Sequence, residues 1–271
     1  MKIKDLVKLG LDRWIGFWDG LQGPELEPPI WHSHFLALRS LDTDLGPVCR
    51  KLTGLVLDIG AGTGFGRRYL DARRARYVPT DLRTHRDPHD TRVTRRGEKL
   101  AVLCSGYALP FHDDCFDAVM AHSLLEHVHD PVKVLGEARR VLAPSGILVV
   151  SVPFCFPVHG LPDDFRRWTC QGLKLEMERA GFEVRNALPV GNGFYSLALN
   201  FNLLLRYTLP VRSRVLYILS AICRPLLLVS QAVVNSIALM LGPLDRTGSL
   251  PGGIALEAKK TPEPLAAARN L

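Results

Sequence analysis

Residues 56–64 read Val56-Leu57-Asp58-Ile59-Gly60-Ala61-Gly62-Thr63-Gly64, so that an apolar run is followed at once by three alternating glycines. The run predicts a buried strand. Glycines directly after a strand allow a tight turn and a close approach of the backbone to a ligand, and a following helix offers unpaired N–H groups. The dinucleotide fingerprint G-x-G-x-x-G does not fit, because its last position falls on Phe65 or Arg67. A nicotinamide dinucleotide is therefore disfavoured as the ligand.

Outward from this loop, apolar runs alternate with helical patterns. The clearest helix has Asp130 as N-cap and Pro131 at its first position, and a second follows Thr169 as N-cap and ends before Gly181. Near-continuous apolar strands separated by helices predict an α/β fold with a doubly wound, Rossmann-like parallel sheet. The expected strands are Leu55–Ile59, Tyr77–Thr80, Leu100–Cys104, Phe116–Ala121, Ile147–Val152, Phe182–Leu188 and Gly253–Lys259.

The composition excludes several classes of protein. A chain of 271 residues with 47% hydrophobic and 23% charged residues is neither disordered nor of low complexity. Its six cysteines include no CxxC pair, so neither a disulfide framework nor a zinc finger is expected. The first 20 residues lack the apolar region and cleavage site of a signal peptide. We therefore expect a cytoplasmic protein, whose net charge of +7 leaves nucleic acid or an anionic membrane open as partner.

Two carboxylates near the glycine-rich loop narrow the choice of ligand. Asp58 precedes the first glycine, where a negative charge favours a cationic ligand and repels a pyrophosphate. Asp81 lies about 20 residues beyond the loop, at the end of the next expected strand, where an acid can accept both hydroxyls of a ribose. A nucleoside with a positive charge fits both, and S-adenosylmethionine is such a molecule. The alternative is a pair of ordinary strand-end carboxylates in an unrelated α/β protein.

A set of motifs in this order resembles the class I S-adenosylmethionine-dependent methyltransferases of the subgroup called type 11. The resemblance covers roughly Leu52 to Lys260, apart from an apolar insertion, and implies a seven-stranded sheet. The segments that carry it are Val56–Gly64, Leu109-Pro110-Phe111, Phe116-Asp117-Ala118-Val119, Leu125-Glu126-His127-Val128 and Asp130-Pro131.

The resemblance implies a cofactor site for S-adenosylmethionine. Three glycines line its methionine part and Asp81 binds its ribose, while the loop that begins at Ser105 borders the adenine. The family usually has Asp where this chain has Ser105, a neutral acceptor whose bond to the adenine amino group is weaker. The expected cofactor-binding residues are Asp58, Gly60, Gly62, Gly64, Asp81, Leu82, Ser105, Gly106, Tyr107 and His122.

A loop after the fifth expected strand, running from His159 to Thr169, is similar to one in methyltransferases of cell-envelope and glycan biosynthesis. Methyl transfer needs a base only when the acceptor must lose a proton, and His127 and His159 are the candidate catalytic residues. Asp163 and Asp164 either orient His159 or pair with the neighbouring arginines. The other histidines, among them His85, His89, His122 and His129, form no convincing ligand set, so no metal site is expected.

Two apolar segments lie outside the expected core. Residues 3–18 form an amphipathic helix with tryptophans on its apolar face, and Trp31–Lys51 reads as a second helix. Between Val184 and Leu244 there is no acidic residue, and Val215–Leu241 is almost wholly apolar around Arg224-Pro225. We expect a helical pair bent at Pro225. The predicted parts are N-terminal helices (1–51), a methyltransferase core (52–190 and 251–260), an apolar basic insertion (191–250) and a disordered tail (261–271).

These features predict an S-adenosylmethionine-dependent methyltransferase that methylates an oxygen of a lipophilic or lipid-linked acceptor of cell-envelope, glycan or secondary metabolism. The arginine-only insertion and the first helix suit an anionic membrane, so we expect a peripheral protein at the inner face. A buried helical subdomain or a homodimer formed through the insertion is the alternative. An RNA methyltransferase and a non-catalytic cofactor-binding scaffold also stay open, although no RNA-binding module accompanies the arginine clusters and nucleic acid is not the expected partner.

Overall fold

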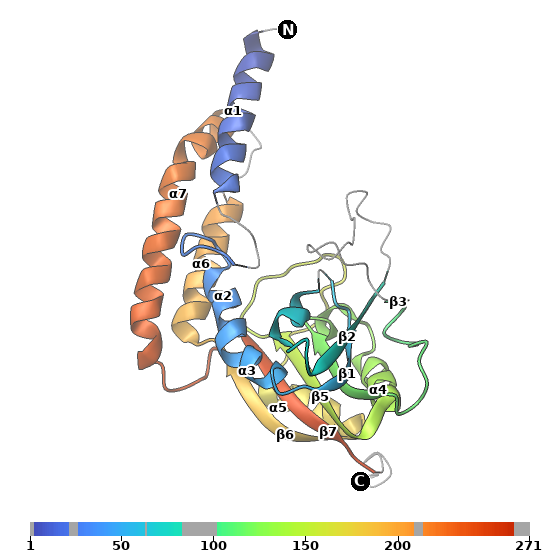
Figure 1. Cartoon of the computed structure of the whole chain (residues 1–271). Coiled ribbons are helices and arrows are strands. Elements are labelled where there is room, and N and C mark those ends of the chain that lie inside the picture. Colours follow the sequence, from blue (N-terminus) through green and yellow to red (C-terminus); the bar gives the residue numbers. More distant parts are fainter. Residues whose placement is uncertain (1–2, 22–26, 63, 83–101, 209–213, 263–271) are drawn as a thin grey trace. The chain divides into compact units, whose positions relative to one another are not determined.

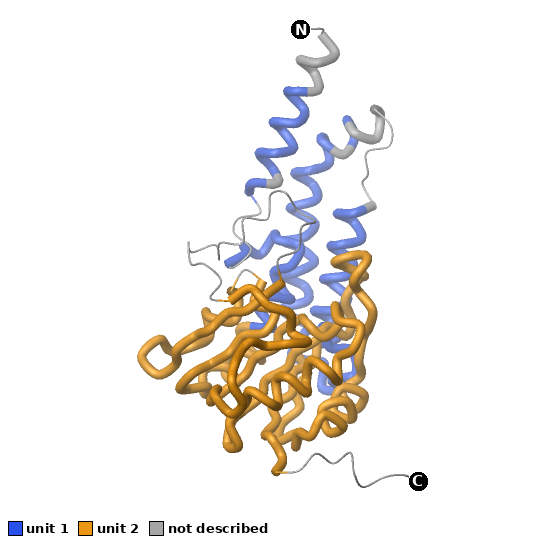
Figure 2. Tube along the Cα trace, turned by 90° about the vertical axis from the view of Figure 1, so that its right-hand side faces the viewer, with its two compact units in different colours: residues 1–41, 191–252 blue, residues 42–190, 253–271 orange. Residues whose placement is uncertain are grey.

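The structure is a computed structural model that describes the chain except for residues 1–2, 22–26, 63, 83–101, 209–213 and 263–271. It divides into two compact units (Figure 2). Residues 1–41 and 191–252 form the first, called here the helical unit, and residues 42–190 and 253–271 form the second, the sheet unit. The sequence-based boundaries separate the N-terminal helices from the insertion, whereas the structure groups them together and assigns residues 42–51 to the sheet unit.

The sheet unit contains a seven-stranded sheet in the order β3-β2-β1-β4-β5-β7-β6 (Figure 1). Strands β1 to β5 pair in parallel, whereas β7 is antiparallel to both β5 and β6. The predicted doubly wound α/β class is confirmed, and the parallel pairing predicted from the first five apolar runs is that of β1 to β5. The antiparallel direction of β7 adds to this prediction, because β6 and β7 pair as the two strands of a hairpin. The strands are β1 (Gly54–Ile59), β2 (Ala75–Asp81), β3 (Val102–Leu103), β4 (Phe116–His122), β5 (Leu142–Pro153), β6 (Phe182–Val190) and β7 (Gly253–Lys260).

Capped helices pack on this sheet and close its core. Helix α4 (Pro131–Val141) begins where the Asp130 carboxylate accepts from Lys133 N at 3.1 Å, and α5 (Cys170–Arg179) begins where Thr169 Oγ1 accepts from Gly172 N at 3.1 Å. Both predicted N-caps are confirmed. The core joins the two helices to the strands through fully buried side chains, including Leu57, Val119, Leu135, Leu148 and Leu173.

The helical unit consists of α1 (Ile3–Gly20), α2 (Phe35–Ser40), α6 (Gly193–Thr208), α7 (Arg214–Leu241) and the short η4 (Gly242–Leu244). The predicted first helix is confirmed. The second was expected over Trp31–Lys51, but it begins at Phe35 and runs through α2, a π-helical turn η1 (Leu41–Leu45) and α3 (Gly46–Cys49). Inside the unit a small apolar cluster joins α2, α6 and α7 around Leu36, Ala198 and Ala238.

Helix α7 continues through Pro225 as one helix of 28 residues, so the segment is a single helix and not the expected pair. Proline cannot donate a backbone hydrogen bond, which leaves the carbonyl four residues earlier without its helical partner. That carbonyl belongs to Ala221, and it accepts instead from Trp14 Nε1 at 2.8 Å. A side chain of α1 therefore replaces the missing backbone donor of α7.

Candidate functional site

The glycine-rich loop that follows β1 adopts left-handed backbone angles. Gly60, Gly62 and Gly64 have φ values of 71°, 52° and 75°, a region that glycine enters without strain. A Cβ at Gly60 would lie 2.7 Å from Leu124 Cδ1, whereas one at Gly62 would meet nothing within 4 Å. Gly60 is therefore needed for packing against the segment after β4, and Gly62 borders open space.

Asp58 lies beneath this loop. The side chain is buried, its Oδ2 accepts from the Tyr77 hydroxyl at 2.6 Å, and a Cβ at Gly66 would lie 2.8 Å from the same oxygen. Burial raises the pKa of Asp58 to about 7, against the opposing effect of the Tyr77 hydrogen bond. The Asp58 carboxyl is thus enclosed next to Gly66 and Tyr77.

Asp81 ends β2 and holds the loop directly. Its Oδ2 accepts from Gly62 N at 2.8 Å and its Oδ1 accepts from Leu82 N at 2.7 Å. A carboxylate offers about four acceptor directions, so these two bonds are compatible with further bonds to a pair of hydroxyls. Leu82, the next residue, is an exposed apolar side chain.

The loop expected to border the adenine is a tight turn after β3. Ser105 Oγ accepts from Tyr107 N at 3.2 Å, and the Tyr107 hydroxyl accepts from Asp130 N at 3.2 Å, which ties the turn to the start of α4. A Cβ at Gly106 would lie 3.3 Å from Ile59 Cγ2, at the end of β1. The turn therefore lies close to the carboxyl end of the first strand.

His122 closes β4 on the same edge of the sheet. Its Nδ1 is hydrogen-bonded to Ser151 Oγ on β5, and its ring stacks on Phe65 with centroids 5.6 Å apart. Burial lowers the pKa of His122 to about 4, so the ring is neutral at physiological pH. The neutral His122 ring thus packs against Phe65, the residue directly after the glycine-rich loop.

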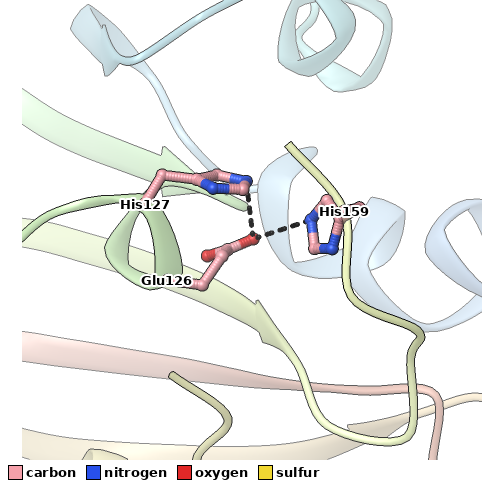
Figure 3. Close-up of side chains that lie close together, drawn as sticks. All are labelled: Glu126, His127 and His159. Carbon is pink, nitrogen blue, oxygen red and sulfur yellow. Dashed lines mark ion pairs between the residues drawn. The ribbon is translucent and has the colours of Figure 1, made fainter. Parts of the chain in front are cut away.

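The two candidate catalytic histidines lie together around a carboxylate (Figure 3). Glu126 and His127 belong to the turn η3 (Leu125–His127), just after β4, and His159 comes from the loop after β5. Glu126 Oε1 lies 3.8 Å from His127 Nε2 and 3.9 Å from His159 Nε2. Burial raises the pKa of Glu126 to about 7, although its own backbone N–H and Arg167 oppose the shift.

Arginines fix the loop that carries His159. Arg167 binds both oxygens of Asp164, at 2.6 and 2.9 Å, and Asp164 accepts in turn from His159 N at 2.9 Å. Arg166 donates to the carbonyls of Val128 and His129 at 2.5 and 2.6 Å, so it clamps the segment after η3. Asp164 thus does both things expected of the acidic pair, because it pairs with an arginine and positions His159.

Comparison with known proteins identifies what part of this chain is similar to. Residues 57–150 match the family described as "Methyltransferase domain". A Mycolicibacterium smegmatis protein named "Probable S-adenosylmethionine-dependent methyltransferase" is 32% identical over 150 residues, which are 51% of this chain and 55% of that protein. An uncharacterized methyltransferase of Mycobacterium sp. (strain KMS) is 34% identical over 96 residues, 35% of this chain and 37% of the relative. The chain thus spans between about a third and about half of the length of these relatives.

Residues 57–150 therefore match a methyltransferase domain, in agreement with the resemblance to class I, type 11 methyltransferases. The methyl donor that such a domain implies is S-adenosylmethionine. Solved structures agree on the fold: a Thermotoga maritima S-adenosylmethionine-dependent methyltransferase has a TM-score of 0.52 at 16% identity and covers 84% of this chain and 91% of its own. The cyclase SpnF has a TM-score of 0.51 at 20% identity, with 80% of each chain covered. Since a cyclase shares it, the fold alone does not specify the reaction.

The residues of the methyltransferase domain fit this cofactor. Within the described residues nothing lies within 4 Å of a Cβ at Gly62, which leaves room for a ligand against the backbone, and Asp81 presents acceptors at the end of β2, where a ribose diol would be held. A nearby sulfonium or ammonium would favour the ionised form of Asp58, whose pKa burial raises to about 7. The roles of the individual cofactor-binding residues stay predictions.

Sequence reasoning missed Glu126. Its signal was present, since a carboxylate directly precedes His127, yet a Glu in a short turn reads as a solvated residue. The structure instead buries the side chain completely. The contact with His159, 33 positions along the chain, depends on the loop after β5 and could not be read from spacing alone.

Proposed function

We propose that the methyltransferase domain transfers the methyl group to an oxygen of a lipophilic or lipid-linked acceptor, with the helical unit bound to an anionic membrane surface. The observation that carries this proposal is the extent of exposed apolar surface on α6 and α7 of the helical unit. Besides apolar side chains, the interior of this unit also contains the amides of Asn202, Gln231 and Asn235.

The exposed apolar side chains follow helical spacing on both long helices. On α7 the stripe recurs every three or four residues, and Leu226 is 67% exposed and Met240 is 79% exposed. Patches of this extent mark a membrane or protein partner. The exposed stripes are Leu197, Phe201 and Leu204 on α6 and Ile222, Leu226, Val229, Val233, Ile237 and Met240 on α7.

The buried amides hold the helices together. Asn202 Nδ2 on α6 donates to Asn235 Oδ1 on α7 at 2.9 Å, and Asn235 Nδ2 donates to the Ile30 carbonyl at 2.6 Å. Hydrogen bonds between buried polar groups are a means by which helices associate where apolar side chains face lipid. Such an arrangement supports burial of the outer face in an acyl environment.

Charge and connectivity favour a surface-bound or re-entrant arrangement over a crossing. Residues 184–244 contain no acidic residue, and arginines near an anionic surface contribute about 1 kcal/mol each. Ala221–Leu244 is long and apolar enough to cross a membrane, by length and composition, and 28% of its apolar stretch is buried. Because β6 and β7 lie side by side in one sheet, the chain between them must leave and return on one side.

For methyl transfer, the main task of the protein is to align the acceptor oxygen with the methyl group. S-adenosylmethionine supplies an electrophilic methyl group on a sulfonium. The acceptor oxygen attacks the methyl carbon, the carbon–sulfur electron pair stays on sulfur, and the proton of the acceptor leaves to a base or to water. His127 and His159 lie at the carboxyl ends of the strands, where open α/β sheets bind their substrates. They are the candidate bases that accept the proton of the acceptor.

Flotation of the full-length protein with vesicles tests the membrane part. The protein should float with vesicles that contain phosphatidylglycerol and should float less with pure phosphatidylcholine. Replacing Leu226 and Met240 together by Glu should abolish flotation, whereas Leu175→Glu on the exposed face of α5 should leave it unchanged. Equal flotation of the double variant and the wild type would overturn the proposal.

A homodimer formed through the same apolar face is the second candidate, since the exposed stripes would suit a copy of the chain equally well. Analytical ultracentrifugation without lipid distinguishes the two. A stable dimer that the Leu226 and Met240 substitutions dissociate, together with no flotation, would favour the dimer. Against RNA as a partner, Arg68 of one arginine cluster is paired with Asp42 at 2.9 Å.

A further inference from the structure

We propose that Glu126, His127 and His159 form a binding site for a divalent transition-metal ion such as Zn²⁺. Their ligand atoms lie within 4.8 Å of one another. Two imidazoles and one carboxylate are a donor set that proteins use for catalytic zinc and for non-haem iron. The proposal departs from the sequence-based expectation of no metal site.

The strongest support is the state of the Glu126 carboxylate. The side chain is fully buried, and neither oxygen accepts a hydrogen bond of normal geometry within the part of the chain that the structure describes. A buried carboxylate without donors is costly, so it requires a compensating cation or a proton. Both histidine Nε2 atoms face Oε1 but stand too far away to donate to it, at 3.8 and 3.9 Å.

Both histidines present the correct nitrogen to the centre of the cluster. His127 Nδ1 lies 2.5 Å from the Asp163 carbonyl, and because a carbonyl only accepts, Nδ1 carries the hydrogen. His159 Nδ1 likewise lies 3.1 Å from the Pro157 carbonyl. Each Nε2 is then left with a lone pair, which is how ligating histidines are oriented by their second hydrogen bond.

The surrounding loop is built to hold this geometry. Arg167 Nη2 also lies 3.2 Å from His159 Nδ1, but it donates to Asp164 and to the Pro157 carbonyl. A Cβ at Gly160 would lie 2.9 Å from His127 Cε1, and this glycine has a φ of 64°. Only glycine therefore lets the loop after β5 approach His127 so closely without strain.

The distances need little adjustment to receive an ion. Ligand atoms about 2.1 Å from a tetrahedral ion are about 3.4 Å apart, so the two pairs at 3.8 and 3.9 Å must close by about half an ångström. The two histidine nitrogens, which lie within 4.8 Å of each other, must close by up to about 1.4 Å. With three protein ligands, a fourth position stays open. An ion there lowers the pKa of a bound hydroxyl, so the acceptor oxygen can lose its proton without a histidine as base; with the ion bound, His127 and His159 act as ligands instead of bases, and this last point rests on the proposed function.

Metal binding by the full-length protein tests the site. After removal of metal with a chelator, the wild type should bind one equivalent of Zn²⁺ in calorimetry. Glu126→Gln and His159→Ala should each weaken binding by at least about 100-fold. The matched control His112→Ala removes an exposed histidine and should bind as the wild type does. Thermal unfolding without metal shows whether each variant is folded.

Three results would overturn the inference. The first is no stoichiometric binding by the wild type, and the second is binding that both substitutions leave unchanged. The third is a thiolate charge-transfer band in the Co²⁺-loaded protein, which would assign the ion to the cysteines. None of these measurements involves lipid, so a failure of the membrane proposal and a failure of the metal site are distinguishable.

Discussion

The two units of this chain use the same kinds of side chain in opposite ways. In the sheet unit Leu173 of α5 and Leu148 of β5 are buried, and charged groups hold loops at the strand ends. In the helical unit Asn202 and Asn235 are buried and bonded to each other, while leucines such as Leu226 are exposed along α6 and α7. The difference shows that apolar composition alone does not locate a core. Each unit has an environment of its own, water for one and, as we propose, an acyl layer for the other.

The largest effect on the free energy of unfolding is expected when one leucine of each unit is replaced by alanine and the two variants are compared. Leu173→Ala empties a fully buried position of the sheet core and should lower the free energy of unfolding by about 2–5 kcal/mol. Leu226→Ala, at a 67% exposed position, should change it by less than about 0.5 kcal/mol in lipid-free buffer. Urea denaturation measures both. A large loss at Leu226 would mean that its face is covered within the protein.

Glu126→Gln sharpens the contrast between a buried carboxylate and buried amides. In metal-free buffer the folded protein binds the Glu126 proton more tightly than the unfolded chain, because burial raises the pKa from 4.5 to about 7. Wild-type stability therefore falls as pH rises from about 4.5 to 7. The variant should be more stable above pH 7, by at most about 3 kcal/mol, and equal at pH 4. Thermal unfolding across this range checks it, and a difference that is independent of pH would contradict it.

Asp81→Asn tests whether the sheet unit alone holds the cofactor. The amide keeps the size of the carboxylate but loses charge and acceptor capacity, so S-adenosylmethionine should bind about 10–100-fold more weakly, equivalent to about 1.5–3 kcal/mol. Calorimetry with the cofactor measures the change, and flotation with anionic vesicles should be unaffected. An unchanged dissociation constant would remove Asp81 from the site.

The smallest effect concerns the single bond that replaces a backbone donor in the helical unit. Trp14→Phe leaves the Ala221 carbonyl without its donor and should lower stability by about 1 kcal/mol. Pro225→Ala restores the backbone N–H, so the double variant Trp14→Phe, Pro225→Ala should recover most of that loss. Chemical denaturation of the four proteins gives the coupling. Simple additivity would show that Trp14 does not compensate for Pro225.

Local signals predicted most of the sheet unit. The caps at Asp130 and Thr169 and the apolar runs are contained in short windows of sequence, so seven strands were located and the fold class was correct. The antiparallel direction of β7 was not, since a strand pattern carries no direction. Pro225 was interpreted as a break because its compensating donor, Trp14, is far away along the chain.

The candidate site divides in the same way. The glycine-rich loop and Asp81 are separated by one helix–strand unit, so their proximity can be predicted from their spacing in the sequence. The Glu126 cluster forms only where the segment after β4 and the loop after β5 come together, which spacing does not predict. The left-handed backbone conformation of Gly160 allows the loop after β5 to approach His127. Glycines in loops are too common for such a role to be assigned without coordinates.

The pairing of Val190 with Gly253 has a consequence for the whole architecture. Two residues opposite each other on antiparallel strands are about 5 Å apart, a span that a short turn can bridge. Everything from Gly191 to Gly252 is then a detour taken within a single hairpin. A catalytic scaffold could acquire or shed such an appendage at one point without disturbing strand order, and a trimmed chain that also omits residues 1–41 would be the natural form in which to study the domain free of its apolar companion.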